Sequence, residues 1–477
     1  MTGSGTLASA AGPVGRFGPR PSLAQLAALL GSGVAYAGLA YGTPRAAFGQ
    51  LLMLAGVALL AYALLLRTRL PLRWGLGAAL AFRLLWLPAE PAFSDDVYRF
   101  HWDGLLVAHG VNPFRFRPDE LIADGGRAAF PKTTLRAEVL PEFQQLYRQL
   151  NSPHYYSVYP PVCQAVFGVA AGLFPHSARG FALVLRLAIL AAEASSAWLL
   201  LALLPAWGLA RGRALRYLLH PLVIIELTGN LHFEALALSF VLLALWLLHR
   251  QQWVRSAVAL GLGVASKMLP LLALPLLWRR LGGGRRFLAY AGLVGGTLLL
   301  LFGPFLSFDL VVHLARSLNL YFRSFEFNAS VYYLLRAVGY HLTTYNEIAR
   351  IGPALALVAA LFGLALAWRE RQPRLRTLPT ALLLLLTVYY LLATTVHPWY
   401  ITPLIALAPL TRFRFPLAWG GLVLLSYSAY RTAAYQESLW LVALEYAGVY
   451  AWLGWELLGG GVREERHAER SEASLPQ

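Results

Sequence analysis

Two adjacent carboxylates, Asp95 and Asp96, stand in the stretch FSDDVYRFHWDGLLVAHGVNPFRF, which begins just after an apolar run. A carboxylate beside an attacking hydroxyl group can take its proton late in the transition state. Where a phosphate leaves in the same reaction, cations are needed, because negative charge accumulates there. These residue types therefore predict group transfer from a phosphate-linked donor to an alcohol, with Asp95 and Asp96 as candidate bases.

Residues elsewhere in the chain could complete such a site by binding the donor and the acceptor. Arginine binds phosphate through two parallel hydrogen bonds, whereas lysine acts as a point charge. Aromatic faces can stack on the apolar side of a pyranose ring. The predicted substrate-binding residues are Arg99, Asp103, His154, Tyr159, Asn230, His232, Lys267, Arg323, Asn328, His397 and Trp399.

Several of these residues also have an interpretation that involves no substrate. Asp95 and Asp96 could cap a helix N-terminus, and Lys267 could be an interfacial lysine at a helix end. Asn230 and His232 could form hydrogen bonds between helices. For the two aspartates we favour the catalytic role, because a single carboxylate would suffice as a cap.

The composition predicts a membrane protein. Of 477 residues, 58% are hydrophobic and only 13% are charged, which excludes a water-soluble fold for most of the length. The net charge of +17 comes from short arginine clusters between apolar runs, a pattern typical of cytoplasmic loops and not of a nucleic-acid-binding face. A single cysteine excludes an intramolecular disulfide, and the motifs of a zinc protease or of a P-loop ATPase are absent.

The apolar runs predict an all-α, polytopic membrane fold with about 11–14 transmembrane helices. The first three are expected at about 23–41, 46–66 and 71–88. Arg67, Arg69 and Arg73 mark the turn between the second and third spans as cytoplasmic. The third span then ends outside, so residues 89–180 are expected to form a large extracytoplasmic catalytic loop with short interfacial helices.

Details of the later chain complete this topology. Residues 97–109 have the pattern of a helix, and residues 162–174 are apolar but short, which suits an interfacial helix. A break between two short helices in VASKMLP places Lys267 on the outer side and keeps the later arginine clusters inside. A second extracytoplasmic loop is expected at 307–347.

Several motifs, taken in order, resemble those of a known enzyme family. They are SDDVYRFHWDGLLVAHGVNPF, YSVYPPVCQAVF, GNLHFEALAL, GLGVASKMLPLLALPLLWRR, FEFNASVYYLLR and VHPWYITPL. Over about residues 70–410, their layout is similar to that of the polyprenol-phosphate-mannose-dependent mannosyltransferases of the GT-C superfamily, bacterial members included. The resemblance implies inverting transfer of a hexose, expected to be mannose, from a polyprenyl-phosphate donor to a lipid-linked or cell-envelope glycan. It implies no cofactor and no metal.

The resemblance also implies where the catalytic acid lies. In such families it stands in the first external loop, a few residues before a Tyr and a G-x-N-P-[FY] turn, which here corresponds to Asp95 or Asp96. The GPI-type pattern separates two acids by one residue, whereas here they are adjacent, and Asp95 is the closer match to the first. Neighbouring residues of a helix point about 100° apart, so only one of the two can face the cleft.

Two other classes of protein are alternatives: a transporter or lipid flippase, and a membrane subunit without activity. A transporter is expected to carry ionisable pairs at mid-membrane and two related halves, whereas here the polar residues concentrate in external loops. We therefore expect a multi-pass glycosyltransferase of the plasma membrane, the inner membrane of a bacterium, with its active site outside. Its membrane domain, 23–458, is expected to lie between cytoplasmic tails at 1–22 and 459–477.

Overall fold

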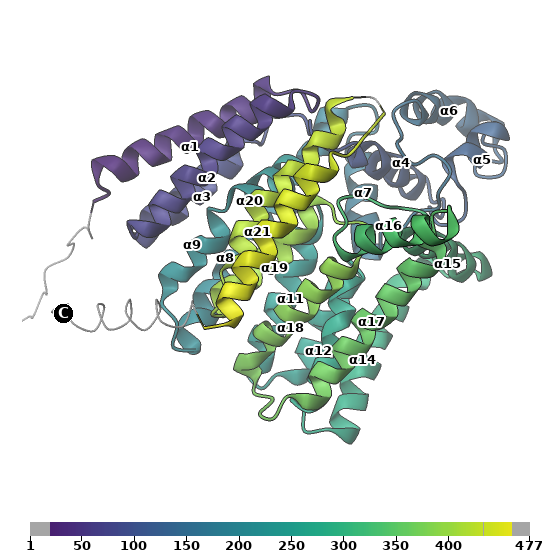
Figure 1. The fold of residues 1–477 in the computed structure, drawn as a ribbon. Helices are drawn as coiled ribbons and strands as arrows, with labels where there is room; N and C mark the ends of the chain where they lie inside the picture. Colours follow the sequence, from purple (N-terminus) through teal and green to yellow (C-terminus); the bar gives the residue numbers. More distant parts are fainter. Residues whose placement is uncertain (1–19, 433, 460–477) are drawn as a thin grey trace, which may run out of the picture.

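The computed structural model describes residues 20–432 and 434–459, and within these residues the chain forms helices and no strand, which confirms the all-α class (Figure 1). The α-helices are α1 (Leu23–Gly42), α2 (Phe48–Arg67), α3 (Leu72–Leu85), α4 (Asp96–Ala108), α5 (Pro118–Ala123), α6 (Thr133–Tyr147), α7 (Pro161–Leu173), α8 (Ala178–Ala206), α9 (Leu215–Leu218), α10 (Pro221–Val223), α11 (Glu234–His249), α12 (Trp253–Val264), α13 (Leu274–Leu277), α14 (Gly284–Phe302), α15 (Phe308–Arg323), α16 (Val331–Thr343), α17 (Ile348–Arg369), α18 (Leu378–Leu392), α19 (Thr402–Leu407), α20 (Phe415–Leu422) and α21 (Leu439–Leu457). Shorter helical turns are η1 (Arg211–Ala214), η2 (Ile224–Gly229), η3 (Leu269–Ala273), η4 (Gly303–Phe305), η5 (Leu375–Thr377), η6 (Pro398–Ile401), η7 (Ala408–Leu410) and η8 (Val423–Arg431), of which η2 is a π-helix. Most of the two predicted cytoplasmic tails lies outside the described residues.

The number of helices that are long and apolar enough to cross a membrane is lower than predicted. Among the described residues six qualify, or seven if the bent pair formed by residues 221–229 and 234–249 is one span. The predicted 11–14 spans exceed this number because several apolar runs form short or broken helices. The run at 214–229, for example, is divided between α9, α10 and η2, since Pro221 has no N–H group to continue a helix.

The two ends of the helix bundle differ in character. Helices α4, α5 and α6 gather at one end, while the turns between α13 and α14 and between α17 and α18 lie at the opposite end (Figure 1). Those two turns are held together by Arg280, which donates hydrogen bonds to Glu370 at 2.6 and 2.7 Å. The segment predicted as the first external loop and the arginine-bearing turns therefore lie at opposite ends of the bundle.

Three helix breaks lie near α4. The first, 230–233, separates η2 from α11 and bends the chain by 114°. The second, 265–268, follows α12 as predicted, and the third, 393–397, follows α18. Because a regular helix ends or begins at each break, the side chains there can be directed into a common space.

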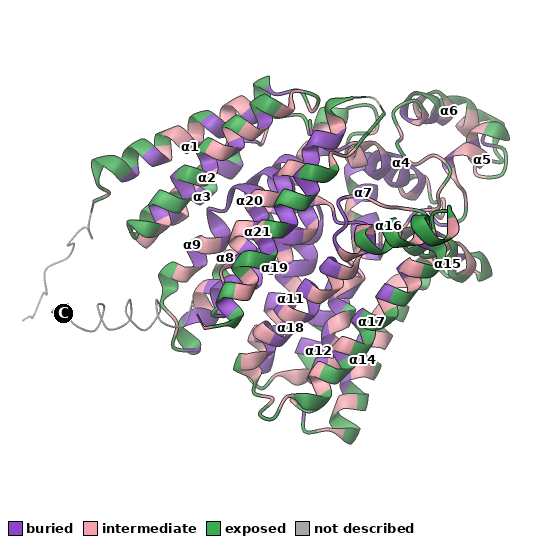
Figure 2. Cartoon of the chain, in the orientation of Figure 1, coloured by how far each residue is buried: buried purple, intermediate pink, exposed green. Residues whose placement is uncertain are grey.

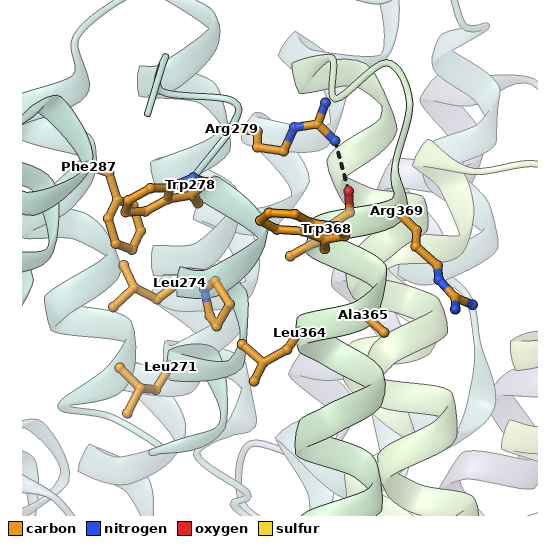
Figure 3. A pocket seen from close by; sticks show the side chains of 11 residues that line it. Leu271, Leu274, Trp278, Arg279, Phe287, Leu364, Ala365, Trp368 and Arg369 are labelled. Carbon is orange, nitrogen blue, oxygen red and sulfur yellow. Dashed lines mark hydrogen bonds between the residues drawn. The ribbon is translucent and has the colours of Figure 1, made fainter. Parts of the chain in front are cut away.

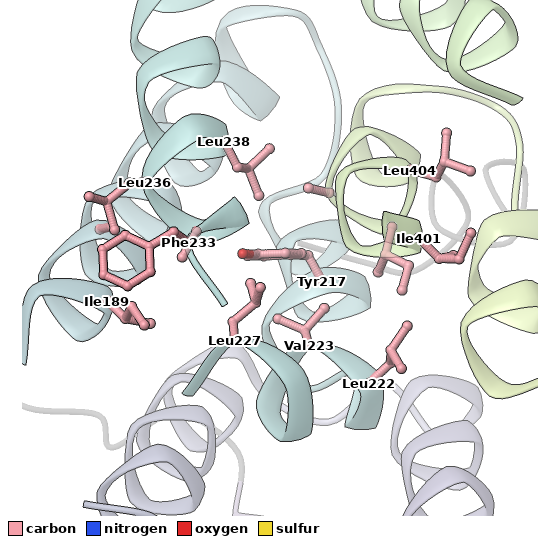
Figure 4. Packing of buried hydrophobic residues seen from close by; sticks show 14 of the residues in the cluster. Ile189, Tyr217, Leu222, Val223, Leu227, Phe233, Leu236, Leu238, Ile401 and Leu404 are labelled. Atoms are coloured by element: carbon pink, nitrogen blue, oxygen red, sulfur yellow. The ribbon is translucent and has the colours of Figure 1, made fainter. Parts of the chain in front are cut away.

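A dense apolar core fixes the positions of the breaks. Buried residues concentrate in the central helices, α11 and α18 among them, whereas α14 and α17 expose much of their surface (Figure 2). Phe233 from the first break lies in the core with Tyr217 and Leu227, and Ile401 and Leu404 enter it from the segment after the third break (Figure 4). The first and third breaks are therefore anchored in one packed layer.

A buried arginine cluster, consisting of Arg83, Arg186 and Glu193, joins α3, α8 and η2 in the interior. Arg83 donates two hydrogen bonds to Glu193 at 2.7 and 2.8 Å, and Arg186 donates to the carbonyl oxygens of Thr228 and Gly229 at 2.9 and 3.1 Å. Arg186 thus satisfies carbonyl groups at the end of η2, where the chain leaves the helix. The cluster therefore holds the end of η2 in place, and with it the start of the first break.

An apolar groove of about 1200 Å³ runs between α13, α14 and α17 (Figure 3). One wall begins at Leu271 and continues through Leu274 to Trp278, and the facing wall carries Leu364 and Trp368. At the arginine-rich end, Arg279 donates a hydrogen bond to the carbonyl oxygen of Trp368 at 3.1 Å and connects the two walls. No carboxylate lines this groove, so it offers a path for an apolar chain and no acid–base group.

Candidate active site

The three breaks bring together a set of polar and aromatic side chains beside the N-terminus of α4. We call this set the break cluster: Asp96, His232, Glu234, Lys267, His397 and Trp399. The imidazole Nε2 of His232 lies 4.0 Å from the Asp96 carboxylate, and the ammonium group of Lys267 lies 2.6 Å from Glu234. Five of these six residues are among those predicted as catalytic or substrate-binding, and Glu234 stands in the GNLHFE motif.

His232 is oriented by the first break. Its Nδ1 lies 3.0 Å from the carbonyl oxygen of Glu226 and 3.2 Å from the Glu226 carboxylate. Because a carbonyl oxygen only accepts hydrogen bonds, Nδ1 carries the proton. The other nitrogen, Nε2, is buried without a hydrogen-bond partner and is directed toward Asp96. An unsatisfied buried nitrogen of this kind is costly unless a ligand meets it.

The backbone of the first break is unusual. Leu231 adopts φ = +64°, a left-handed conformation that L-residues with side chains avoid, and such strain is typically retained at functional sites. Asn230 stabilises the turn by accepting a hydrogen bond from the Phe93 backbone N–H at 3.2 Å and donating one to Glu226 at 3.2 Å. Asn230 therefore connects the break to the segment before α4 and is not directed at an open space.

Lys267 stands at the second break, one residue after Ser266, which is fully buried. The N-terminus of α7 holds this break in place, because the backbone N–H of Val162 donates to the Ala265 carbonyl at 3.0 Å and the Cys163 thiol donates to the Ser266 carbonyl at 3.1 Å. The Lys267 side chain is 33% exposed, and its ammonium group lies 5.1 Å from the centre of the Tyr400 ring. The position combines a fixed backbone with an accessible cation.

The third break contributes a stack of rings. The ring of Trp399 lies between those of His232 and His397, with centroid separations of 3.8 and 4.5 Å, and Phe327 continues the stack beyond His397 at 4.8 Å. Burial, followed by the neighbouring charges of His232 and Lys267, lowers the pKa of His397 to about 3, so its ring is neutral at physiological pH. Its Nδ1 has no hydrogen-bond partner. His397 therefore offers a hydrogen bond to a ligand and no positive charge.

The two adjacent aspartates point in different directions. Asp95 accepts a hydrogen bond from Arg45 at 2.7 Å, whereas Asp96 is directed toward His232 and is 23% exposed. Burial raises the pKa of Asp96, and the positive charges of His232 and Lys267 oppose this shift only in part. A raised pKa makes a carboxylate a better proton acceptor near neutral pH. Asp96 rather than Asp95, which the sequence slightly favoured, has the surroundings of a base.

Arg99 and Asp103 form a separate buried pair further along α4. Arg99 donates to Asp103 at 2.9 Å and to the Tyr155 carbonyl at 2.9 Å, and Asp103 also accepts hydrogen bonds from Ser157 and Gln164. Asp103 is fully buried. The pair fastens the segment around residues 152–157 to α4, so the structure does not bring these two predicted residues to the break cluster.

The remaining predicted residues also lie in other surroundings. Tyr159 packs edge-on against Phe100 at 4.9 Å, and His154 is exposed and lies 2.8 Å from Asp119. Arg323 is exposed in the last turn of α15. Asn328 is buried and adopts φ = +47°, with its amide group directed at Glu445. It follows Phe327, whose backbone pairs with the third break through Thr394 and Val396.

Two residues of the site escaped the sequence analysis. Arg45, between α1 and α2, binds Asp95, and Glu226 in η2 orients His232 and accepts a hydrogen bond from Tyr427 at 2.5 Å. A signal for Arg45 was present, because positive residues are rare on the outer side of short external turns. The signal for Glu226 was weaker: it is an acidic residue within an apolar run. Within the described part of the chain, no group of three or more His, Cys, Asp or Glu side chains could hold a metal ion.

The arrangement is suited to transfer between a phosphate and a hydroxyl group. Asp96 supplies a proton acceptor, Lys267 supplies a cation, and the stack around Trp399 holds the rings of His232 and His397 in place. The polar atoms that lack partners, Nε2 of His232 and Nδ1 of His397, can then bind hydroxyl or phosphate oxygens of a substrate.

A comparison with known protein families agrees with this chemistry. A family model described as alpha-(1→6)-mannopyranosyltransferase, N-terminal domain, matches residues 2–281. These residues contain Asp95, Asp96, His232 and Lys267, but not the third break. No curated protein matches the chain.

Proposed function

The chain belongs to the alpha-(1→6)-mannopyranosyltransferase family, and from this premise we propose that it transfers mannose from a polyprenyl-phosphate donor to a hydroxyl group of a lipid-linked or cell-envelope glycan. Membership makes it a membrane mannosyltransferase, with a mannose donor and a glycan acceptor. The polyprenyl chain of the donor, the kind of acceptor and the roles of individual residues belong to the proposal.

The observation that carries the proposal is the position of Asp96. It is a recessed carboxylate with a raised pKa, 4.0 Å from an unsatisfied imidazole nitrogen and within electrostatic range of Lys267. A base with a cation within electrostatic range is what an inverting glycosyl transfer needs.

In the proposed step, an acceptor hydroxyl group attacks the anomeric carbon of mannose. A new carbon–oxygen bond forms as the bond from that carbon to the phosphate oxygen breaks, and the hydroxyl proton passes to Asp96. The electron pair of the broken bond stays with polyprenyl phosphate, whose growing charge Lys267 stabilises. His232 binds through Nε2 and keeps the substrate beside Asp96, and Trp399 fixes the orientation of His232 through their stacked rings.

The apolar groove supports a lipid-linked donor. Leu271 begins the groove four residues after Lys267, which is roughly 6–8 Å along a helical backbone at 1.5–2.0 Å per residue. A phosphate at Lys267 could therefore be followed directly by an apolar chain along α13. Apart from Arg279 and Arg369, the groove would offer a nucleotide sugar only apolar surface.

The proposed site belongs to the external side of the membrane. Residues 89–180 would form the catalytic loop and 307–347 a second external loop, in agreement with the arginine-bearing turns at the opposite end of the bundle. The localisation that follows is the inner membrane of a bacterium, with the acceptor outside the cytoplasm.

The test uses purified full-length protein in phospholipid vesicles. The donors would be synthetic polyprenyl-phosphate mannose, the matching glucose compound and GDP-mannose, each with labelled sugar, and the acceptor would be an α-mannoside. We expect label in the acceptor only from polyprenyl-phosphate mannose, and a signal near background from the Asp96→Asn variant.

Two outcomes would contradict the proposal. Transfer from GDP-mannose with none from the lipid donor would show that the donor class is wrong. Movement of the intact lipid donor between vesicle leaflets, without any mannose transfer, would favour the transporter alternative instead.

A further inference from the structure

A small recess lies on the other side of the paired aspartates from the break cluster. Its volume is about 290 Å³, near the lower limit of roughly 300–1,000 Å³ for ligand pockets, which suits a single sugar residue. The turn between α1 and α2 forms one wall, and the end of η8 with the residues after it forms the other. The lining residues are Arg45, Ala46, Tyr430, Arg431, Thr432 and Tyr435.

Arg45 organises this recess. Its guanidinium group donates to Asp95 at 2.7 Å and to the Tyr435 hydroxyl at 3.3 Å, and it lies 4.7 Å from the centre of the Tyr430 ring. The side chains of Arg45 and Asp95 are 20% and 28% exposed, so both can be reached from solvent. The recess thus presents a guanidinium group beside a carboxylate that offsets its charge.

The two tyrosines supply flat surfaces. The rings of Tyr430 and Tyr435 meet edge to face at 87°, with centroids 5.6 Å apart, and Tyr435 is 53% exposed. A pyranose ring has an apolar face of C–H groups and a rim of hydroxyl groups. The aromatic faces match the first, and the adjacent donor and acceptor groups of Arg45 and Asp95 match the second.

The recess also has the right position for an acceptor. Asp95 and Asp96 are consecutive, so their Cα atoms are about 3.8 Å apart, but one side chain turns to Arg45 and the other to His232. Tyr430 is close enough to both aspartates for their charges to act on it. A sugar in the recess would therefore be beside Asp96, while Lys267 approaches Asp96 from the break cluster.

We propose that the recess lined by Arg45, Tyr430 and Tyr435, with Asp95 bound to Arg45, is the acceptor subsite, which holds the terminal hexopyranose of the acceptor glycan so that a hydroxyl group reaches Asp96. This inference rests on the proposed function, because it takes Asp96 as the base. It gives Asp95 a role distinct from that of its neighbour: Asp95 binds the acceptor and Asp96 accepts its proton.

The experiment separates acceptor binding from donor chemistry. Octyl α-mannopyranoside serves as the acceptor probe, and the full-length enzyme is compared with its Tyr435→Ala variant. We expect the acceptor KM to rise on the order of tenfold, the effect of losing one aromatic stacking surface. The donor KM and the slow hydrolysis of donor by water should stay within about twofold of wild type, because neither needs the recess.

Two variants serve as controls. Tyr435→Phe keeps the ring and should retain most of the acceptor affinity, and Tyr345→Ala removes a tyrosine that is 72% exposed elsewhere, which should change neither KM. Saturation-transfer NMR with the mannoside alone gives a second measurement that needs no turnover. It should detect binding to wild type and a clear loss in Tyr435→Ala.

The outcomes distinguish this inference from the proposed function. An unchanged acceptor KM in Tyr435→Ala, or mannoside binding that persists unchanged in that variant, would overturn the subsite. A donor KM that rises as much as the acceptor KM would also overturn it. If wild type transfers no mannose but binds the mannoside, and Tyr435→Ala does not, the subsite stands and the proposed reaction fails.

Discussion

The buried arginine cluster and the break cluster contain the same kinds of groups but differ in how completely those groups are satisfied. In the buried arginine cluster every side-chain nitrogen of Arg83 and Arg186 has a hydrogen-bond partner, and Arg83 and Glu193 are at most 5% exposed. In the break cluster His232 and His397 each keep a buried nitrogen without a partner, and Lys267 is one-third exposed. Acids and cations inside a membrane bundle are therefore not sufficient evidence of chemistry. Unsatisfied polar atoms beside an accessible charge distinguish a site from a structural contact.

The largest effect is expected from the base of the break cluster. Asp96→Asn should lower kcat by about 10³-fold, within the 10²–10⁴-fold range of general base catalysis, while the donor KM changes little. Steady-state kinetics with polyprenyl-phosphate mannose measures both constants. The matched control is Asp95→Asn, which should retain kcat within about tenfold and act mainly on the acceptor KM. Equal losses of kcat in the two variants would contradict the division of roles.

The buried arginine cluster should respond in stability instead. Arg83→Met leaves Glu193 charged and unpaired, which should lower the free energy of unfolding by about 3–5 kcal/mol. Thermal unfolding in detergent measures this loss. In the double variant with Glu193→Leu, most of the stability should return, because neither member of the Arg83–Glu193 ion pair is left without its partner, and the activity per folded molecule should stay close to that of wild type. An Arg83→Met protein that is stable but inactive would place this cluster in the chemistry.

The apolar groove gives a further test of the difference between the two clusters. Its first residue, Leu271, follows Lys267 of the break cluster by four residues, whereas the groove has no such connection to the buried arginine cluster. Leu364→Trp narrows the groove and leaves less space for the polyprenyl chain. The KM of a long polyprenyl donor should therefore rise by roughly tenfold, equivalent to about 1.4 kcal/mol of binding free energy. The same variant should leave the KM of a short-chain donor unchanged. Leu30→Trp, on the exposed face of α1, is the control. A loss that is equal for both donors would indicate a packing defect in α17.

The fold was predictable where one helix corresponds to one apolar run. The runs at 23–41 and 46–66 match α1 and α2 within two residues, because about 20 apolar residues without proline can satisfy their backbone groups in only one way. The apolar run at 214–229 forms short helices instead, because Pro221 interrupts it. Hydrophobicity alone does not register such breaks, so the predicted 11–14 spans exceed the six or seven helices of the described residues that are long and apolar enough to cross a membrane.

The site was predictable in its residue types but not in its partners. The motifs identified His232, Lys267, His397 and Trp399, because polar residues at helix breaks are conspicuous in an apolar chain. They could not show that Arg45 turns Asp95 away from the base position, since 50 residues separate the two. That pairing depends on how α1 and α2 pack beside α4, which no local pattern contains.

The smallest expected effect is a displacement of the pH profile, and it tests whether Asp96 and Lys267 act in one site. Burial raises the pKa of Asp96, and the charge of Lys267 lowers it. The base works only when ionised, so kcat/KM should fall as the pH decreases through this pKa, at a higher pH than an ordinary aspartate would give. Lys267→Met removes one of the opposing charges, and the fall should then begin at a still higher pH, whatever the loss in rate. Tyr217→Phe, which removes a hydroxyl group 3.4 Å from Glu193 in the buried arginine cluster, should leave the profile in place. If Lys267→Met does not move the profile, the charge of the lysine does not act on the aspartate. The break cluster would then be a set of structural contacts, like the buried arginine cluster, and not a single site.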